Sequence, residues 1–439
     1  MKEIILTALI FCLPFSPLVN AYGQTDVHLS INKEARKKML VAIPNFITTD
    51  TNIKGDRTAV NGADILKNDL NLSGFFDSID TQIINQINIL DINEDIIHYS
   101  KWEEVGAQAL IKCEYAANEK GITFKLRLFD IANEKYLVGK LYRGQHSHLR
   151  KLIHKFADEV VYAFYKEKGI AQTKISFVSK NRGHKELFVI DYDGNNLKQY
   201  SKERSLVLSP EWSPDGAKIV FTTYRYNNPD LKVLTLKGKK SKIIASFPGL
   251  NTTPAWSPDG KKIALTLSKD GNPEIYLLNA KGKLQRLTHY RGIDISPTWS
   301  PNGEKIAFTS DRSGTPQIYI MDTTRGDSDK IKRITFNGAY NDLPVWSPLG
   351  DKIAYSSKQN SRFQILIKDL NNGNDIQITN NWENKESPSW SPNGRFLAFS
   401  SEGIEGSAVY VVKSNGTGMR RLTFLKGGGF FPAWSPILN

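Results

Sequence analysis

Short runs of strand-forming residues alternate with polar, glycine-containing turns along the chain from about residue 172 onward. Apolar runs of four or five residues bounded by turn signals are typical of β-strands joined by hairpins. One type of run occurs at Ile175–Val178, Ile219–Thr222, Ile263–Leu267, Ile306–Thr309, Ile353–Ser356 and Phe396–Phe399. A second type occurs at Glu186–Ile190, Leu231–Leu234, Glu274–Leu278, Gln317–Met321, Gln364–Lys368 and Val409–Val412. With a third run and the strand that enters the next motif, the repeating unit is predicted to have four strands.

The tripeptide Trp-Ser-Pro marks the period of this repeat. Its tryptophans are Trp212, Trp256, Trp299, Trp346, Trp390 and Trp434, with gaps of 44, 43, 47, 44 and 44 residues. A period in the forties combined with strand-like content is the signature of a β-propeller. An Asp-Gly or Asn-Gly pair follows most copies and predicts a tight turn. Glycine suits this turn because it takes a positive φ without a steric penalty. Leu349 replaces the Asp or Asn in one copy. The tryptophans are expected to pack between neighbouring sheets.

The two ends of the array predict how the ring closes. The first unit, from Lys174, has no Trp-Ser-Pro ahead of it, and no strand run follows the copy at Trp434 before Asn439. A strand at Phe431–Trp434 would complete the blade that begins at Lys174. Closure of this kind leaves no open sheet edge. We therefore expect a six-bladed β-propeller, residues 172–439, closed by the C-terminal strand.

Residues 22–171 lack the repeat and are predicted to form a small α/β domain. Strand-like segments are Val27–Ile31, Met39–Phe46, Gln108–Ala116 and Ile122–Asp130, and Trp102–Gly106 is expected to be helix or loop. Apolar residues at helical spacing predict helices at Asn61–Leu72 and Leu149–Lys168, with Gly169 ending the second.

The first 21 residues have the features of a secretory signal peptide. Ile4–Leu13 is nearly all apolar but too short to span a bilayer as a helix. Val19 and Ala21 are the small residues that signal peptidase requires at −3 and −1, so cleavage after Ala21 is expected. An uncleaved anchor and a lipoprotein modified at Cys12 are the alternatives. We expect an exported chain.

The positive charge is confined to one part of the chain. The formal net charge is +13, yet residues 22–173 contain 20 basic and 20 acidic residues, so the excess lies in the propeller. Such a domain would attract acidic partners. Solvated hairpin tips such as Lys237–Lys242 are the simpler explanation. No basic stripe interleaved with aromatic residues is present, so we expect no nucleic-acid partner.

No constellation of residues for catalysis is recognisable. The sequence has no G-x-S-x-G, H-E-x-x-H, P-loop or G-x-G-x-x-G motif, and its 7 histidines are scattered. Asp191–Asn195 has its glycine too early for an EF-hand calcium loop, so a turn is favoured. We expect no catalytic residue, no cofactor and no metal. Cys113 is the one cysteine after the signal, and a buried structural thiol is favoured.

Function in a propeller usually lies in loops that change from blade to blade. Because strands alternate in direction within a blade, the loops before each Trp-Ser-Pro share one face, which we call the mouth, and the Ser-Pro-Asp-Gly hairpins lie on the opposite face. The mouth loops are Gly249–Thr253, Arg291–Ile295, Gly338–Asp342, Asn384–Ser387 and Lys426–Phe430. Their polar and aliphatic side chains suit a peptide or protein ligand.

Several segments of the chain are similar to the TolB family, whose members are periplasmic components of the Tol–Pal envelope system. The resemblance rests on Val41–Phe46, Leu70–Phe75, Trp102–Gln108, His154–Val160, Pro254–Ala264 and Phe431–Pro436. It implies a non-enzymatic, monomeric adaptor that supports outer-membrane integrity and envelope constriction at cell division. It also implies two protein partners, the peptidoglycan-associated lipoprotein Pal and the inner-membrane protein TolA, with other outer-membrane proteins as further candidates.

The resemblance also implies which residues contact each partner. Pal would be bound at the mouth by Leu250, Asn251, Thr252, Thr253, Asp294, Ile295, Ser296, Asn341, Asp342, Lys385 and Glu386. TolA would be bound by the segment after the cleavage site, Tyr22, Gly23, Gln24, Thr25 and Asp26, which runs into Val27–Ile31. This segment has no distinctive family motif of its own.

Two other classes of function stay open. A polysaccharide-binding scaffold is favoured by the loop aromatics Tyr224, Tyr226, Tyr340 and Trp382. A propeller lyase or a relic of a peptidase would need His, Asp or Arg clustered around the channel, and the mouth loops contain no histidine.

Overall fold

The computed structural model describes residues 38–48, 58–86, 96–325 and 331–438. The signal peptide, the cleavage site at Ala21, the TolA-facing segment Tyr22–Asp26 and the strand at Val27–Ile31 therefore lie outside the described residues. Within the described ranges, no helix is both long and apolar enough to cross a membrane.

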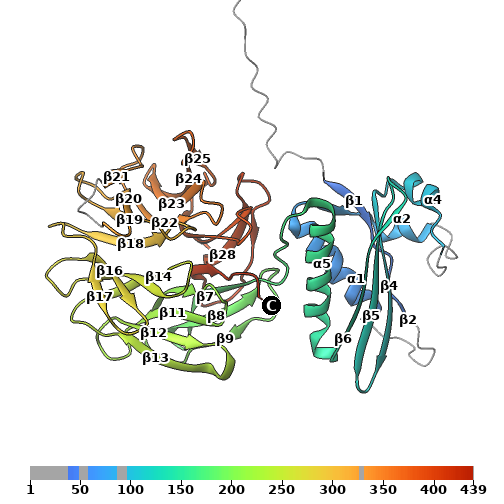
Figure 1. Ribbon diagram of the computed structural model, residues 1–439, viewed down its shortest axis with the longest axis horizontal. Coiled ribbons are helices and arrows are strands. Elements are labelled where there is room, and N and C mark those ends of the chain that lie inside the picture. Colours follow the sequence, from blue (N-terminus) through green and yellow to red (C-terminus); the bar gives the residue numbers. More distant parts are fainter. Residues whose placement is uncertain (1–37, 49–57, 87–95, 326–330, 439) are drawn as a thin grey trace, which may run out of the picture. The chain divides into compact units, whose positions relative to one another are not determined.

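A mixed sheet forms the core of the amino-terminal part (Figure 1). Its strands are β1 (Met39–Ala42), β2 (Ile47–Thr48), β3 (Phe76–Ser78), β4 (Ala109–Asn118), β5 (Gly121–Asp130) and β6 (Lys135–Gly144). They are ordered β3-β1-β4-β5-β6, with β2 beside β4. The β1 strand is parallel to β3 and β4, whereas β4, β5 and β6 form antiparallel hairpins. The predicted α/β fold is confirmed.

The helices of this part are α1 (Thr58–Ser73), α2 (Thr81–Gln86), α4 (Tyr99–Glu104), the 3-10 turn η2 (His146–His148) and α5 (Leu149–Tyr165). Apolar residues of α1 and α5 share one buried cluster with the sheet, because each helix presents a hydrophobic stripe to it. In this cluster Leu66 and Phe156 are fully buried together with Phe124 of β5.

Two local predictions for this part need correction. The strand expected at Met39–Phe46 is interrupted, since Pro44 has no N–H for the sheet ladder. The long helix ends at Tyr165, where Lys166 takes the left-handed cap at φ 57°, and not at Gly169. A side chain on Gly169 would collide with Asp158, whose carboxylate accepts a hydrogen bond from the N–H of Ala171 at 2.8 Å. The glycine therefore allows a close approach and does not cap the helix.

Six four-stranded antiparallel sheets follow, and they form the blades of the predicted propeller (Figure 1). Five are consecutive in sequence, with the strands β10 (Val207–Trp212), β11 (Lys218–Thr223), β12 (Asp230–Thr235), β13 (Lys240–Ala245); β14 (Asn251–Trp256), β15 (Lys262–Leu267), β16 (Glu274–Asn279), β17 (Leu284–Arg286); β18 (Asp294–Trp299), β19 (Lys305–Ser310), β20 (Gln317–Asp322), β21 (Lys332–Arg333); β22 (Asn341–Trp346), β23 (Lys352–Gln359), β24 (Arg362–Asp369), β25 (Asp375–Gln377); and β26 (Asn384–Trp390), β27 (Phe396–Gly403), β28 (Gly406–Lys413), β29 (Arg420–Arg421). A 3-10 turn, η3 (Lys237–Lys239), precedes β13.

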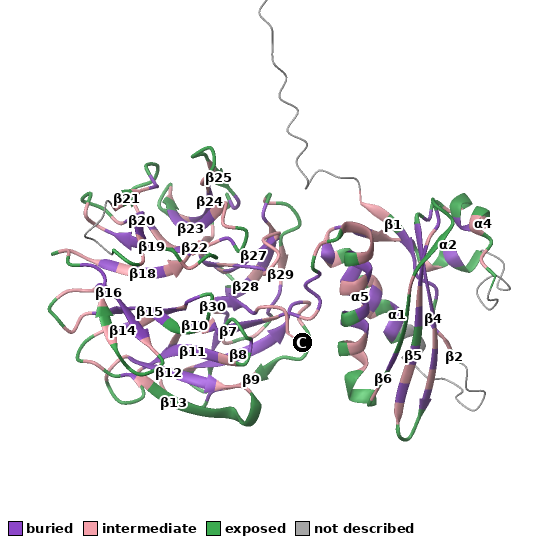
Figure 2. Cartoon of the chain, in the orientation of Figure 1, coloured by how far each residue is buried: buried purple, intermediate pink, exposed green. Residues whose placement is uncertain are grey.

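The sixth blade joins the two ends of the array, as predicted. Its strand order is β30-β7-β8-β9, with β7 (Lys174–Asn181), β8 (His184–Asp191), β9 (Lys198–Gln199) and β30 (Phe430–Trp434). Strands β30 and β7, which join the two ends of the array, lie side by side in Figure 2. Their junction is extended by Ser435, whose N–H donates to the carbonyl of Lys174 at 2.8 Å.

The motif tryptophans lie between neighbouring blades. The indole N–H of Trp212 donates to the carbonyl of Ala433 at 3.0 Å, and that of Trp299 donates to the carbonyl of Ala255 at 3.0 Å. Trp390 does the same to Val345 at 3.1 Å. In each case the acceptor belongs to the inner strand of the preceding blade, so these tryptophans hold adjacent sheets together.

Candidate functional site at the mouth of the propeller

The inner strands β10, β14, β18, β22, β26 and β30 share one irregularity. Each has a β-bulge just before its Trp-Ser-Pro motif. The residue before the proline of each bulge has a positive φ, between 45° and 57°: Ser209, Thr253, Ser296, Leu343, Ser387 and Phe431. Such a backbone conformation costs on the order of 1–3 kcal/mol for a residue other than glycine. Repeated in every blade, it bends the strands around a central cavity of about 120 Å³ lined by the six prolines.

The third residue before each proline forms a buried layer. Its members are Val207, Asn251, Asp294, Asn341, Lys385 and Gly429, and all are buried. All but Val207 belong to the predicted mouth loops, and the expectation that these loops are solvated is wrong at these positions. The Pal contacts predicted for Asn251, Asp294, Asn341 and Lys385 stay predictions. Their polar side chains are instead used inside the protein: Asn341 donates to the side chain of Gln317 at 2.7 Å, and Lys385 pairs with Glu383 at 2.7 Å.

The second residue before each proline forms a partly exposed layer, which we call the mouth ring. It consists of Leu208, Thr252, Ile295, Asp342, Glu386 and Phe430. Four of these were among the predicted contact residues, Phe430 was in a predicted mouth loop but not among the contact residues, and Leu208 was in neither set. Counting back from the proline of every repeat would have found them. Of the remaining predicted residues, Leu250 and Thr253 are partly exposed and Ser296 is buried.

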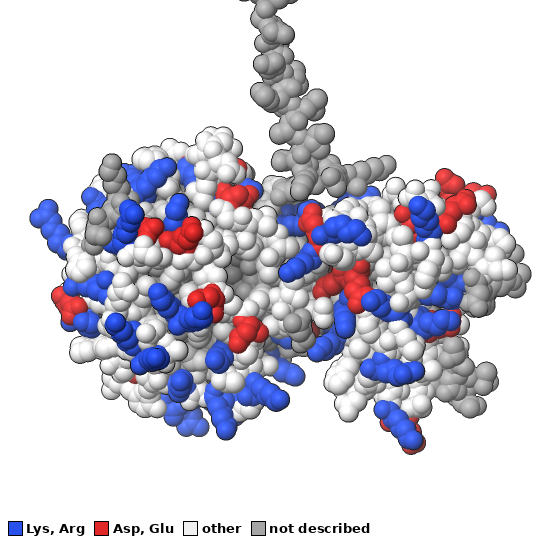
Figure 3. Space-filling view, viewed as in Figure 1, with Lys and Arg blue, Asp and Glu red and all other residues white. Residues whose placement is uncertain are grey.

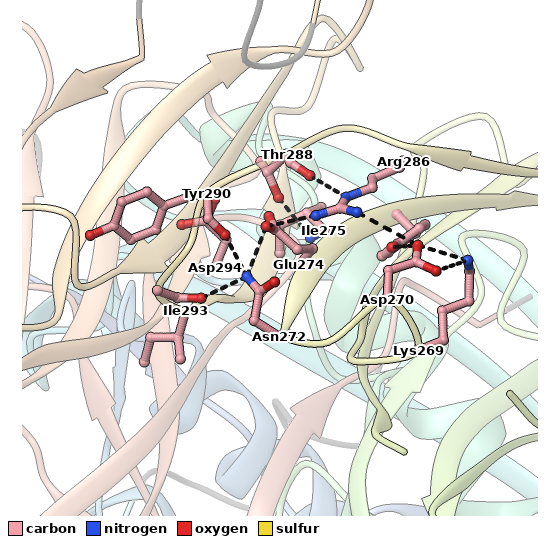
Figure 4. A network of polar contacts seen from close by, with 12 residues as sticks. Lys269, Asp270, Asn272, Glu274, Ile275, Arg286, Thr288, Tyr290, Ile293 and Asp294 are labelled. Carbon is pink, nitrogen blue, oxygen red and sulfur yellow. Dashed lines mark hydrogen bonds and ion pairs between the residues drawn. The ribbon is translucent and has the colours of Figure 1, made fainter. Parts of the chain in front are cut away.

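A polar network behind the mouth ring fixes the loop that leads to Asp294 (Figure 4). Asn272 donates to the carboxylate of Glu274 at 2.9 Å and to the carbonyl of Gly292 at 2.8 Å. Arg286 forms an ion pair with the same oxygen of Glu274, at 3.0 Å. Asp294 itself is fully buried and pairs with Arg312 at 2.7 Å. The predicted Asp294 is therefore held by an arginine inside the network.

One sector of the mouth ring is acidic. Asp342 accepts a hydrogen bond from the hydroxyl of Thr309 at 2.8 Å. Burial raises the pKa of Glu386, and the neighbouring charges of Glu402 and Asp342 raise it further. Three carboxyl groups that lie close enough to influence one another create a local negative potential, although the propeller as a whole is basic. This sector would attract a cationic group of a partner.

The central cavity contains a single charged side chain among its lining residues. Glu211 occupies a position that is Ala255, Thr298 or Val345 in other blades. Burial raises the pKa of its carboxyl group to about 8. Its protonation state therefore changes near neutral pH. The sequence gives the signal, since a glutamate stands where other repeats have an uncharged residue.

Exposed apolar side chains surround the mouth. Phe336, Trp382 and Phe424 follow the outer strands β21, β25 and β29, and Ile404 lies in the turn between β27 and β28. All four are more than half exposed, and Ile404 reaches 89%. Antiparallel connection places these loops on the same face as the start of each inner strand. Trp382 belongs to the aromatic set predicted from the sequence, while Phe336, Ile404 and Phe424 were missed.

The other aromatics of that set differ in exposure. Tyr226 is 58% exposed in the loop between β11 and β12. Tyr340 is only partly exposed, and its ring meets that of Phe363 edge to face with centroids 5.6 Å apart. Tyr224 is also partly exposed. Only Tyr226 and Trp382 of the four therefore present a large ring surface to solvent.

Lysine and arginine side chains are distributed over the propeller surface visible in Figure 3, with acidic side chains among them. The segment Lys237–Lys242 runs through η3 and the outer strand β13, and its residues are exposed (Figure 2). This arrangement agrees with solvated hairpin positions.

A second cluster of titratable groups lies at the first blade. Asp69 of α1 accepts hydrogen bonds from His154 of α5 at 2.6 Å and from the hydroxyl of Tyr192 at 2.7 Å. Asp193, which follows in the β8–β9 turn, pairs with Arg150. Burial lowers the pKa of His154, but the hydrogen bond and the charge of Asp69 outweigh this effect, so the pKa is raised overall.

Potential metal ligands occur in this cluster: Asp69, His154 and Asp193 each offer a ligand atom, and these atoms lie within 4.8 Å of one another. The carboxylates already have protein partners, so we interpret the cluster as a link between helices and blade. The Asp191–Asn195 segment is a turn, as expected, with the N–H of Gly194 donating to the carbonyl of Asp191 at 2.9 Å.

Comparison with known proteins gives a consistent result. The model of the TolB amino-terminal domain matches residues 27–137, and the model of the TolB β-propeller domain matches residues 163–438. A Tol-Pal system protein TolB from Desulfosudis oleivorans is 35% identical over 225 residues, which are 51% of this chain and 50% of that protein. One from Geobacter metallireducens is 43% identical over 121 residues, 28% of each chain. The chain thus spans half or less of these curated relatives.

A solved structure extends the similarity over most of the chain. The crystal structure of TolB from Acinetobacter baumannii matches with a TM-score of 0.79 and 28% identity, and the match covers 91% of this chain and 97% of that one. The propeller model alone covers more than half of the sequence. Together with the six closed blades and the amino-terminal sheet, these matches show that the chain belongs to the TolB family.

Proposed function

We propose that the protein is a non-enzymatic periplasmic adaptor of a Tol–Pal envelope system. It is exported by residues 1–21 and cleaved after Ala21. It binds a Pal-type lipoprotein through the mouth of the propeller and a TolA-type protein through Tyr22–Asp26. In this role it supports outer-membrane integrity and constriction at division. The proposal is supported by family membership and by the names of the relatives.

The observation that carries the mouth assignment is the contrast between the two layers of each inner strand. The buried layer is occupied by internal hydrogen bonds, whereas the mouth ring offers aliphatic, aromatic and acidic groups to solvent. Exposed Phe336, Trp382 and Phe424 add rigid apolar surface around it. Aromatic side chains are enriched at protein-binding sites.

The decisive experiment measures binding of the purified mature chain to the periplasmic domain of the Pal lipoprotein from the same organism. Ile295→Asp introduces an uncompensated charge into the mouth ring, and we expect at least a tenfold loss of affinity. Leu349→Asp is the matched control, because Leu349 is 66% exposed in a hairpin on the opposite face. Equal affinity of the two variants would contradict the mouth assignment.

The TolA arm has its own test. Deletion of Tyr22–Asp26 should abolish binding of a TolA C-terminal domain. The same variant should still bind Pal through its propeller. Retention of TolA binding after this deletion would move that contact elsewhere on the chain.

Polysaccharide binding is the second candidate, supported by the exposed rings of Tyr226 and Trp382. Aromatic side chains with a free face are suited to stacking on sugar rings. A pull-down from envelope extracts separates the two functions. Recovery of glycan without a protein partner, and its loss in Trp382→Ala, would favour the scaffold over the adaptor.

A further inference from the structure

The end of the propeller opposite the mouth carries a concentration of lysine in two neighbouring blades. In the blade of β10–β13 and the blade of β14–β17, this end is formed by the hairpin after the inner strand and by the turn that leads into the outer strand. These segments contain nine lysines and two aspartates, and their net charge of +7 is more than half of the chain's +13. We call the surface they form the lysine face; it consists of residues 213–218, 236–242, 257–262 and 280–283.

The four segments of the lysine face are contiguous. In the first blade, the N–H of Leu236 donates to the carbonyl of Ala217 at 3.0 Å, which joins the turn to the hairpin. In the second blade, β15 begins beside the end of β16 in the same way. The two hairpins lie next to each other, since a Cβ atom on Gly260 would be 3.9 Å from Pro214. Figure 3 shows lysine and arginine side chains gathered along the lower edge of the propeller, where β13 lies in Figure 1.

Most of these lysines have no counter-charge in the fold, and eight of the nine are exposed. In the described part of the chain, Lys261 alone among them is within ion-pair distance of a carboxylate, that of Asp259 at 3.6 Å. The ammonium of Lys239 lies 5.0 Å from the ring centroid of Tyr200, a contact that leaves its charge in place. Asp259 also accepts a hydrogen bond from the hydroxyl of Ser257 at 2.6 Å, inside its own hairpin. The face therefore presents a strongly positive potential to solvent.

The corresponding segments of other blades do not show this excess. In the blade of β22–β25 they contain one lysine, Lys352, which pairs with Asp351 at 2.7 Å. In the blade of β26–β29 they contain no lysine, and their two arginines have partners inside the protein. Arg395 pairs with Glu167 at 3.2 Å, and Arg420 donates to a backbone carbonyl at 2.8 Å. A general preference of turns for solvated lysine would affect all blades alike, so the excess in two neighbours favours a surface for an anionic partner.

The type of residue restricts the class of this partner. Protein interfaces are depleted in lysine and enriched in arginine and aromatic residues. The lysine face contains no arginine and no aromatic residue. Clusters of lysine bind anionic lipid head groups well, because an ammonium on a flexible stem reaches a phosphate without a fixed geometry. The composition therefore fits the surface of an anionic membrane better than a protein.

We propose that the lysine face adsorbs to a membrane surface that contains anionic phospholipid. The lysines act together on the lipid phosphates, so binding is reversible and weakens as salt screens the charges. Because the face lies at the end opposite the mouth, a chain adsorbed in this way presents the mouth away from the lipid. The proposal goes beyond the adaptor function and does not depend on it.

The test uses the full mature chain and vesicles that contain phosphatidylglycerol and phosphatidylcholine in equal parts. Cosedimentation at low salt should show binding to these vesicles and none to vesicles of phosphatidylcholine alone. Raising the salt concentration should weaken the binding about tenfold or more, because the interaction is electrostatic. Absence of binding to the phosphatidylglycerol vesicles at low salt would overturn the proposal, and so would equal binding to both kinds of vesicle.

A triple variant locates the surface. Lys237→Gln, Lys240→Gln and Lys281→Gln together remove three charges from the two blades, and we expect a loss of affinity for the vesicles of about tenfold or more. All three side chains are exposed, so the fold should be unchanged, which circular dichroism and Tm would verify. Unchanged affinity of this variant would place the membrane contact elsewhere and overturn the assignment.

The matched control removes the same number of charges from exposed lysines toward the mouth end: Lys180→Gln, Lys202→Gln and Lys358→Gln. These positions lie at the end of β7, after β9 and near the end of β23. The control variant should bind the vesicles as the wild type does. An equal loss in the two triple variants would show that net charge, and not the lysine face, determines binding, which would overturn the proposal.

A final arm separates a lipid surface from an acidic protein. Polyglutamate is compared with the vesicles at the same concentration of negative charge. We expect tighter binding to the vesicles, because a membrane offers phosphates to many lysines of the face at once. Binding to polyglutamate that is lost in the Lys237, Lys240 and Lys281 variant, without binding to the vesicles, would assign the face to an acidic polypeptide and overturn the membrane proposal.

Discussion

The mouth and the junction at the first blade both contain carboxylates, and they use them in opposite ways. At the junction, Asp69 is fully enclosed and each of its oxygens accepts a hydrogen bond, from His154 or from Tyr192. In the mouth ring, Glu386 is partly exposed and its nearest charges are also negative. Asp69 stabilises the fold through these two partners, whereas the carboxylate of Glu386 is available to a ligand. Burial with partners, not residue type, therefore distinguishes structural acids from candidate binding acids.

The largest effect is expected at the junction. Asp69→Ala would leave His154 and Tyr192 without their acceptor, and removal of one partner from a buried charged network typically costs about 3–5 kcal/mol. Urea unfolding should show this loss. Asp69→Asn keeps an oxygen acceptor and should cost less. Equal stability of Asp69→Ala and the wild type would show that the network is not structural.

Glu211 in the central cavity should make stability depend on pH. Its folded pKa of about 8 lies above the ordinary value for glutamate, so the folded state holds this proton more tightly than the unfolded state. This contribution is present at low pH and is lost as pH rises toward 8. Between pH 5 and pH 9 the wild type should therefore lose about 4 kcal/mol more than Glu211→Gln. Parallel stability profiles of the two proteins would contradict the raised pKa.

Adjacent residues of one inner strand allow the sharpest comparison. Asn341→Ala should reduce stability by about 1–3 kcal/mol, because it removes the hydrogen bonds that Asn341 donates to the side chain of Gln317 and to the carbonyl of Asn337. Asp342→Ala, one residue later in the mouth ring, should weaken Pal binding more than it changes stability. Denaturant unfolding gives the change in stability of each variant, and a binding measurement gives its change in affinity for Pal. A larger loss of stability in Asp342→Ala and a larger loss of Pal binding in Asn341→Ala would contradict the separate roles of the mouth ring and the buried layer.

The smallest effect concerns backbone strain in the bulges. Leu343 has a φ of 54°, a conformation that asparagine adopts more readily than leucine. Leu343→Asn should therefore raise stability by up to about 1 kcal/mol if its partly exposed side chain contributes little packing. A loss above that amount would mean that the leucine side chain matters more than the backbone conformation.

The propeller could be predicted from the sequence because every blade repeats the same local signals. Trp-Ser-Pro, the turn glycine and two apolar runs recur at fixed spacing, so six weak signals support one another. The amino-terminal part has no such redundancy. The edge strand β6 was missed because most of its residues are exposed, so it lacks the alternation of a half-buried strand.

The burial of several residues in the predicted mouth loops was not foreseen from the sequence. Asn251 and Asp294 are polar residues beside glycine-rich loops, which favours a solvated position when the sequence is considered alone. Both side chains are used inside the protein: Asn251 donates to the carbonyl of Phe247 in its own loop, and Asp294 pairs with Arg312 of the same blade. A polar residue type does not reveal such internal partners when the sequence is considered alone.

Closure of the ring by β30 has a consequence for the order in which the chain can mature. The partner of β7 is the last strand of the sequence, so β7 keeps an unpaired edge until residues 430–434 are available. A chain that is synthesised from its amino terminus therefore carries an incomplete blade until residues 430–434 have been added. Loss of the carboxy-terminal residues that form β30 would remove its pairing with β7, which closes the ring. The other five four-stranded sheets would keep all their strands.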